Sequence, residues 1–441
     1  MRSLFIAPQV PWPLDVGSKI RVLHLLESYR RLGPVTLVCF AQTCAEAQMT
    51  RYLRDIVESV HCCPLTEDPR AAGKWGALLQ ATRPLPRIVR AFQDAALAAE
   101  VEALLASERF DFVHLERIFM AGNLTAAARR GAAAAGVSRI LDVDDLESAK
   151  LWRTLSLDPW WRASRWLAML EYLKLRRYEQ RVLSWFDLSL VCSDVDRRRI
   201  EARRPFPAVR VVSNGADLPT VADSPADDSP ADDARTLIFL GAMNYQPNQE
   251  AVSFFVRAIF PLIKRTIADA RFIIAGKSPP ANISALHNGS DVVVHGYVAN
   301  KQALFAACTV FVVPIRTGGG TRIKILEAMA AGIPVVSTSV GCEGIEAATG
   351  VDILVGDSPH SFADACIQLL TSAERRAAVG RAGRELVVRR YRWEAIQAEL
   401  AAALKSLRRA DGEPTDHVEH TVASMTRLEA RGIRAGSSTR C

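Results

Sequence analysis

A glycine-rich loop bordered by basic residues marks the second half of the chain. It comprises three glycines and three cations, namely Gly318, Gly319, Gly320, Arg316, Arg322 and Lys324. Glycines let the backbone N–H groups approach an anion closely, and the start of a helix adds partial positive charge. Glu327, one turn further on, suits neutral donors such as ribose hydroxyls. The pattern predicts a sugar-nucleotide site, with the diphosphate at the glycines and the ribose at Glu327.

The elements that would position this loop lie on either side of it. An apolar run at 309–314 predicts a buried strand, a helical pattern follows at 323–331, and a β-branched run at 334–339 predicts the next strand. Strand, glycine-rich turn, helix and strand form a βαβ unit. The alternative is an ordinary strand-to-helix connection whose basic residues face water.

Acidic residues and a histidine follow two apolar runs in the first half of the chain. These runs, 110–115 and 139–143, predict parallel strands, which bind ligands at their carboxyl ends. The residues at those ends are His114, Glu116, Asp142, Asp144 and Asp145. We therefore expect Asp144, Asp145 and His114 to be candidates for catalysis. The alternatives are a structural histidine and acids that cap a helix or face water.

A loop after the first predicted strand, 3–7, precedes a predicted helix at 20–32. It carries Gly17, Ser18, Lys19 and Arg21. Because it lies at the carboxyl end of a strand that opens a doubly wound sheet, where such folds bind ligands, we expect it to border a ligand site.

The order of elements predicts an α/β protein of two Rossmann-like domains with a cleft between them. Between the two series of strands lies an acidic segment rich in Pro and Ala, which reads as a linker. The predicted parts are an acceptor domain at 1–217, the linker at 218–234, a nucleotide-sugar domain at 235–388, a helix at 389–409 and a disordered tail at 410–441.

Composition narrows the class of protein. The chain has 441 residues, 49% of them hydrophobic, and a net charge of +7, which suits anionic substrates. No nucleic-acid-reading motif accompanies that charge. Nine cysteines without a C-x-x-C pair indicate neither a disulfide framework nor a metal site, and favour a reducing cytoplasm. The N-terminus predicts neither a signal peptide nor a membrane span.

Tryptophans and arginines cluster at 152–181, where Trp152, Trp160, Trp161 and Trp166 are found. A basic helix that carries tryptophans can lie on an anionic membrane surface. It can equally pack on its own domain with the arginines in water.

The donor-loop sequence, GGGTRIKILEAMAAGIPVVST, resembles the donor-binding motif of the retaining glycosyltransferases of family 4, which have the GT-B fold. It is most similar to bacterial exopolysaccharide sugar transferases. The family motif carries two glutamates at a fixed spacing, and Glu327 matches the second, which in the family holds the ribose. The first falls at Gly319. Because of this departure the resemblance does not predict which sugar the donor carries. It implies that the backbone amides of the glycine loop contribute more to donor binding.

Other matches to the family are looser. Asn244 lies in the turn where the family usually places an Arg and a Lys for the diphosphate, so that role is expected to pass to the cations of the glycine loop. His295 precedes a Gly-Tyr turn like the one near the nucleobase in the family. The N-terminal loop also resembles the family's, with Ser18 at its second glycine, and the resemblance implies that Gly17, Ser18, Lys19 and Arg21 lie on the acceptor side of the cleft. In the family the helix expected at 389–409 crosses back onto the first domain.

The pair Asp142 and Asp144 has several interpretations. A metal site like that of GT-A glycosyltransferases belongs to a different, single-domain fold, and the nucleophile of haloacid dehalogenases belongs at the start of its domain. In family 4 the corresponding strand often ends in His-Asp, and by that match Asp144 replaces the His and Asp145 is the Asp. Such a carboxylate could orient the acceptor hydroxyl or the sugar.

The resemblance implies transfer of a sugar from a nucleotide-diphospho-sugar to a saccharide or lipid-linked acceptor with retention, in exopolysaccharide biosynthesis. It implies no metal and no cofactor besides the donor substrate, and same-face attack with the leaving phosphate as base. We expect a cytoplasmic protein, in possible contact with the inner face of an anionic membrane, and no nucleic-acid partner. The alternatives are a sugar-nucleotide 2-epimerase of the same fold and a non-catalytic partner in polysaccharide assembly.

Overall fold

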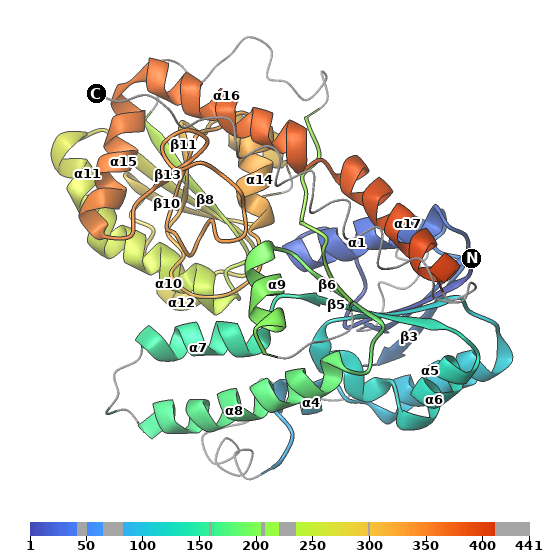
Figure 1. The fold of residues 1–441 in the computed structure, drawn as a ribbon. Coiled ribbons are helices and arrows are strands. Elements are labelled where there is room, and N and C mark those ends of the chain that lie inside the picture. The colour runs from blue at the N-terminus through green and yellow to red at the C-terminus, as the bar shows by residue number, and fades with distance from the viewer. Residues whose placement is uncertain are drawn as a thin grey trace, which may run out of the picture.

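Two parallel sheets, each packed between helices, form two α/β domains (Figure 1). The structure, a computed structural model, describes residues 1–41, 51–64, 83–157, 161, 163–203, 208–219, 235–298 and 300–410. The α/β class and the two Rossmann-like domains predicted from the sequence are confirmed.

The first sheet has seven parallel strands in the order β3-β2-β1-β4-β5-β6-β7. Its central strands are continuous apolar runs because helices cover both faces. The carboxyl ends of β1 and β4 meet at the point where the strand order reverses, which is where such sheets bind ligands. The strands are β1 Ser3–Ala7, β2 Val35–Ala41, β3 Ser59–Pro64, β4 Phe112–Glu116, β5 Ser138–Asp144, β6 Leu188–Val191 and β7 Ala208–Val211.

Helices pack on both faces of this sheet, in two separate apolar cores. They are α1 Gly17–Arg30, α4 Arg87–Ala91, α5 Ala95–Ser107, the 3-10 helix η1 Ile118–Asn123, α6 Ala126–Ala134, α7 Glu147–Leu157, α8 Ala163–Leu183 and α9 Asp194–Glu201. Helices α7 and α8 run side by side as a long hairpin that projects from the domain (Figure 1).

The second sheet has six parallel strands in the order β10-β9-β8-β11-β12-β13. They are β8 Thr236–Leu240, β9 Arg271–Ala275, β10 Val292–Gly296, β11 Val310–Val313, β12 Val335–Ser337 and β13 Leu354–Val355. The order again reverses between β8 and β11, so the turns after these two strands share the ligand-binding edge.

The helices of the second domain surround one apolar core. They are α10 Gln246–Phe254, the π-helix η3 Phe255–Ile259, α11 Phe260–Thr266, α12 Ala281–Ser284, α13 Lys301–Ala306, α14 Ile323–Ala330, α15 Pro359–Thr371 and α16 Ala373–Arg390. A last helix, α17 Trp393–Ala410, packs along α1 of the first domain (Figure 1), where Leu400 and Leu404 join that domain's core. The chain thus passes back from the second domain to the first.

Some elements of the structure were not predicted from the sequence, and some predicted segments lie outside the described residues. Strand β3 was not expected. Helices α15 and α16 are separate because the side chain of Ser372 caps the start of α16. Most of the expected linker, residues 220–234, and the expected tail, residues 411–441, lie outside the described residues. Among the helices that the structure describes, none is long and apolar enough to cross a bilayer.

Candidate active site between the two domains

The glycine-rich loop connects β11 to α14. Gly318 and Gly320 have φ angles of +95° and +68°, in the left-handed region that favours glycine. Arg322 is the residue that precedes the first turn of α14, and its guanidinium folds back to donate to the carbonyls of Gly320 and Thr317. The loop is therefore held by its own arginine against the start of the helix.

Arg322 and Lys324 are cations for which the described residues supply no carboxylate within ion-pair distance. The Lys324 ammonium donates to Asn248 Oδ1 at 3.0 Å and lies 4.3 Å from the ring centroid of Phe239. Burial lowers the pKa of Lys324 to about 7, and the charge of Arg322 acts in the same direction. Burial also lowers the pKa of Arg322. Two under-compensated cations beside glycine amides suit a bound anion.

The structure brings only some of the expected donor-site residues to this place. Arg316 pairs with Glu250 and its guanidinium stacks 3.8 Å from the Phe254 ring centroid, so α10 holds it. Asn244 and His295 are exposed at the ends of their segments. Asn248, in the first turn of α10, accepts a hydrogen bond from the Lys324 ammonium. Lys324 therefore reaches the segment just after β8, where the family resemblance expects cations.

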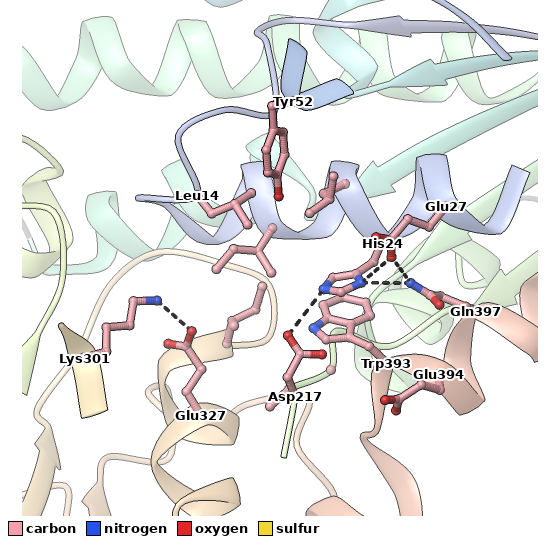
Figure 2. A pocket seen from close by; sticks show the side chains of 15 residues that line it. Leu14, His24, Glu27, Tyr52, Asp217, Lys301, Glu327, Trp393, Glu394 and Gln397 are labelled. Carbon is pink, nitrogen blue, oxygen red and sulfur yellow. Dashed lines mark hydrogen bonds and ion pairs between the residues drawn. The ribbon is translucent and has the colours of Figure 1, made fainter. Parts of the chain in front are cut away.

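Glu327 lines a pocket of about 480 Å³ between α1, α14 and the start of α17 (Figure 2). On one side the Lys301 ammonium pairs with Glu327 at 2.8 Å. On the other side the ring of His24 stacks on Trp393 with centroids 4.2 Å apart. The pocket therefore lies between the two domains, with the expected ribose ligand on its wall.

Asp144 lies in a buried ionic cluster at the end of β5. It has a φ of +54°, an uncommon conformation for a residue with a side chain. Its carboxylate pairs with Arg117 at 2.5 Å and accepts a hydrogen bond from the thiol of Cys192 at 2.7 Å. Burial would raise the pKa of Asp144, but Arg117 and Arg21 hold it below its usual value, so the group is ionised at neutral pH.

Asp145 faces the glycine loop of the other domain. It pairs with Lys150 at 2.6 Å and with Arg117 at 3.3 Å. A Cβ atom placed on Gly319 would lie 2.8 Å from Lys150 Cγ and 3.3 Å from Asp145 Cβ, and one on Gly320 would lie 3.1 Å from Asp145 Oδ2. The two glycines thus allow a carboxylate and an ammonium of the first domain to lie directly against the loop.

Further polar contacts join the domains around this junction. Arg153 of α7 donates to the Gly318 carbonyl at 2.7 Å and pairs with Glu343, which also pairs with Arg199 of α9. Asn214 donates to Thr321 Oγ1 at 2.8 Å. The glycine-rich loop is consequently in contact with three separate segments of the first domain.

His114 does not lie in the cleft, contrary to the expectation from its position at a strand end. It is fully buried, its ring stacks on Phe5 at 4.1 Å, and its Nδ1 lies 2.9 Å from the hydroxyl of Tyr29. Burial holds the pKa of His114 well below its usual value, so the ring is neutral. Glu116 is buried as well, and burial raises its pKa to about 8. We conclude that His114 is part of the core.

The four predicted residues of the N-terminal loop lie in two places: Gly17 faces the second domain, whereas Arg21 is buried inside the first. Gly17 begins α1 and faces Ile323, whose Cδ1 would lie 3.4 Å from an added Cβ. Ser18 accepts a hydrogen bond from Gln9, and Lys19 pairs with Asp15 at 3.1 Å. The remaining member, Arg21, is buried.

Arg21 is a structural residue of the first domain. Its guanidinium donates two hydrogen bonds of 2.7 Å to the carboxylate of Asp142 and one to the Val212 carbonyl. Burial would lower the pKa of Arg21, but the charge of Asp142 raises it above its ordinary value. A paired, buried guanidinium of this kind ties α1 to the ends of β5 and β7.

Four residues at the junction were not identified from the sequence, namely Arg117, Lys150, Arg153 and Asn248. Lys150 and Arg153 are three positions apart, so they share one face of α7. That spacing is present in the sequence, but the tryptophans in the same segment favour a membrane-binding helix over a helix that contacts the other domain. Arg117 and Asn248 carried no signal, because their partners are distant in the sequence.

Comparison with known families assigns both domains. Residues 16–215 match the family described as "Glycosyl transferase 4-like domain", and residues 234–372 match "Glycosyl transferases group 1". The fold matches a crystal structure of Anabaena Alr3699/HepE in complex with UDP and glucose, with a TM-score of 0.62 over 92% of this chain and 100% of that one, at 14% sequence identity. The chain is a two-domain α/β protein with the GT-B fold. It is built from a glycosyl transferase 4-like domain and a glycosyl transferases group 1 domain.

Curated relatives align over part of their length. A GDP-mannose-dependent alpha-(1-6)-phosphatidylinositol monomannoside mannosyltransferase of Mycobacterium tuberculosis is 34% identical over 160 residues, which is 33% of this chain and 42% of the relative. A phosphatidyl-myo-inositol mannosyltransferase of Mycolicibacterium smegmatis is 27% identical over 235 residues, 51% of this chain and 58% of the relative. The matched segments thus span about half of these relatives.

Proposed function

We propose that this protein transfers a sugar from a nucleotide-diphospho-sugar to a saccharide or lipid-linked acceptor, with retention and without a metal or other cofactor. The observation that carries the proposal is the pair Arg322 and Lys324. Both cations border a glycine loop at a helix start, and no carboxylate of the described residues lies within ion-pair distance of either. A diphosphate would supply the missing negative charge.

The donor would lie along α14. Its diphosphate would contact the amides of the glycine loop, and its ribose would bind Glu327 in the pocket of Figure 2. One relative named above is a GDP-mannose-dependent mannosyltransferase, the other is a phosphatidyl-myo-inositol mannosyltransferase, and the structural neighbour holds UDP and glucose. These names support a nucleotide-diphospho-hexose as donor.

In the proposed reaction the acceptor hydroxyl oxygen bonds to the anomeric carbon as the bond from that carbon to the diphosphate breaks. The hydroxyl proton passes to the leaving phosphate on the same face of the sugar. Negative charge grows on the diphosphate, so Arg322, Lys324 and the glycine amides would stabilise the transition state. Asp144, paired with Arg117, and Asp145, paired with Lys150 against the glycine loop, would orient the sugar or the acceptor.

The acceptor side supports a lipid-linked substrate. The α7–α8 hairpin exposes large apolar side chains, with Trp152, Trp161 and Trp166 at 50%, 69% and 65% exposure. Arg176 and Arg177 are exposed on the same hairpin. Such a surface would bind the anionic inner face of a cytoplasmic membrane and bring the cleft to a lipid carrier, as exopolysaccharide assembly requires.

Two alternatives make different predictions. A sugar-nucleotide 2-epimerase of this fold would convert the donor without any acceptor, so product analysis with donor alone distinguishes it. A non-catalytic partner would bind the donor without turnover. It is kept as an alternative because the first glutamate of the family motif is a glycine here.

Glu327→Ala tests the donor site by isothermal titration calorimetry with UDP- and GDP-hexoses. Loss of a charge-assisted hydrogen bond to ribose should cost roughly 1.5–3 kcal/mol, or about one to two orders of magnitude in affinity. Glu385→Ala, on the exposed face of α16, is the matched control and should bind as the wild type does. Unchanged affinity in a folded Glu327 variant would remove the donor assignment.

A further inference from the structure

The pocket of Figure 2 has an excess of acceptor groups. Four carboxylates line it, from Glu27, Asp217, Glu327 and Glu394. Three of them have partners: Glu27 accepts from Gln397, Glu327 pairs with Lys301, and Glu394 lies 3.5 Å from the guanidinium of Arg392. Of these four carboxylates, Asp217 therefore has the most distant partner among the described residues.

Asp217 lies where the segment that links the two domains begins, between Glu327 and Trp393 in the view of Figure 2. The side chain of Asp217 is 72% exposed, and its nearest basic group among the described residues is the His24 ring, whose Nε2 is 4.0 Å away, beyond hydrogen-bond range. The part of Asp217 that is enclosed raises its pKa, His24 acts against this, and the nearby Glu394 and Glu27 raise the pKa further. A ligand that donates hydrogen bonds would relieve this accumulation of negative charge.

The remaining walls suit a flat ring. The apolar lining comes from both domains: Leu14, Ile20 and Leu23 belong to the first and Ile323 to the second. Tyr52 also lines the pocket, with its ring directed toward it (Figure 2). A volume of about 480 Å³ is within the usual range for small-molecule sites and can hold a nucleoside. Since Glu327 is on the same wall, a ribose bound there would direct its base into this space.

The chemistry of Asp217 distinguishes among bases. Guanine presents two adjacent N–H donors on one edge, which a carboxylate accepts as a bidentate pair. Uracil and thymine present one N–H flanked by two carbonyl oxygens, which a carboxylate repels. We propose that the pocket takes the nucleoside of the donor and that Asp217 selects guanine, which makes the sugar donor a GDP-sugar. This proposal rests on the proposed function and specifies its substrate.

The test is a calorimetric comparison of GDP, UDP, ADP and dTDP binding to the full chain. We expect GDP to bind at least about tenfold more tightly than UDP. Asp217→Asn places an amide where uracil can give and receive one hydrogen bond each, so GDP affinity should fall about tenfold while UDP affinity stays or rises. Asp364→Asn, an exposed site on α15, is the matched control.

The outcomes separate the two proposals. If no nucleoside diphosphate binds, the donor site itself is wrong. If UDP binds as tightly as GDP, or if Asp217→Asn weakens all four nucleotides alike, the donor site stands and guanine selection by Asp217 is wrong. A purely structural role for Asp217 in the linking segment cannot change the ratio of GDP to UDP affinity.

Discussion

Lys324 has a pKa close to neutrality, and this makes donor affinity depend on pH. Its pKa is lowered to about 7, so the free protein loses the ammonium charge as the pH rises through 7. A bound diphosphate stabilises the ammonium, so the complex holds a proton that the free site has released. Affinity for a nucleotide-sugar should therefore fall as the pH rises from 6 to 8.5.

Calorimetry at pH 8 in buffers of different ionisation enthalpy would measure the expected proton uptake. A nucleotide-sugar is the proper probe, because its diphosphate does not titrate in this range. Lys324→Met should bind weakly and lose the pH dependence, whereas Lys405→Met, an exposed position on α17, should keep both. A pH-independent wild type would show that Lys324 does not contact the diphosphate.

A substitution at Asp144 can separate its proposed role in turnover from its contribution to the stability of the fold. Asp144→Asn keeps the shape of the side chain but removes the charge next to Arg117. We expect turnover to fall by about two orders of magnitude or more, and unfolding free energy by about 1–3 kcal/mol.

Asp142→Asn is the control for Asp144, because Asp142 is buried and paired with Arg21 in the same cluster. It should lower stability, measured by urea unfolding, without a comparable loss of turnover per folded molecule. If both variants lose turnover only in proportion to stability, Asp144 is a structural acid.

At the scale of elements, the α7–α8 hairpin predicts binding to anionic vesicles. Its exposed apolar side chains include Trp166, Leu170 and Leu173. Basic residues add roughly 1 kcal/mol each near an anionic surface, and salt screens that attraction. Arg176→Gln with Arg177→Gln should therefore reduce co-sedimentation with anionic vesicles and leave donor affinity unchanged.

The equivalent double change on α16, Arg381→Gln with Arg384→Gln, removes the same charge from exposed positions away from the hairpin. It should leave vesicle binding at the wild-type level. Wild-type protein that stays in the supernatant at low salt would show that the hairpin is not a membrane-binding surface. Arg162, part of the same basic cluster in the sequence, lies outside the described residues.

Helices and strands could be predicted from the sequence where burial gives them a regular hydrophobic pattern. Strands β1 and β11 are continuous apolar runs because they are central and covered on both faces. Strand β3, with the sequence SVHCCP, escaped notice because it is an edge strand whose residues are mostly half-buried. The glycine loop and α14 were predicted within a residue, since the turn and the helix are encoded locally.

The ion pairs of the site could not be predicted in the same way. Arg316 has the same local setting as Arg322, yet it pairs with Glu250, which is 66 positions away. Arg21 looked like a cleft residue and instead binds Asp142, 121 positions away. Which cation remains available to a ligand depends on how loops from distant strands meet, and a single sequence does not report that.

At the scale of the whole molecule, Glu343 of the second domain connects the two domains through ion pairs beside the glycine-rich loop. It pairs with Arg153 of α7 and Arg199 of α9, and Arg153 also holds the Gly318 carbonyl. These contacts cross the cleft, so they favour the arrangement in which Asp145 and Lys150 lie against the glycines. Glu343→Gln removes one charge from two such pairs at once.

We expect Glu343→Gln to loosen the contact between domains while leaving each domain folded. Small-angle scattering should show a larger radius of gyration, hydrogen exchange should be faster in the glycine loop, and turnover should fall because the two halves of the site meet less often. Glu346→Gln is the matched control, since Glu346 is exposed and pairs with Arg390 of its own domain. An unchanged radius and unchanged exchange in the Glu343 variant would mean that apolar packing of α17 on α1, and not this ionic junction, holds the domains together.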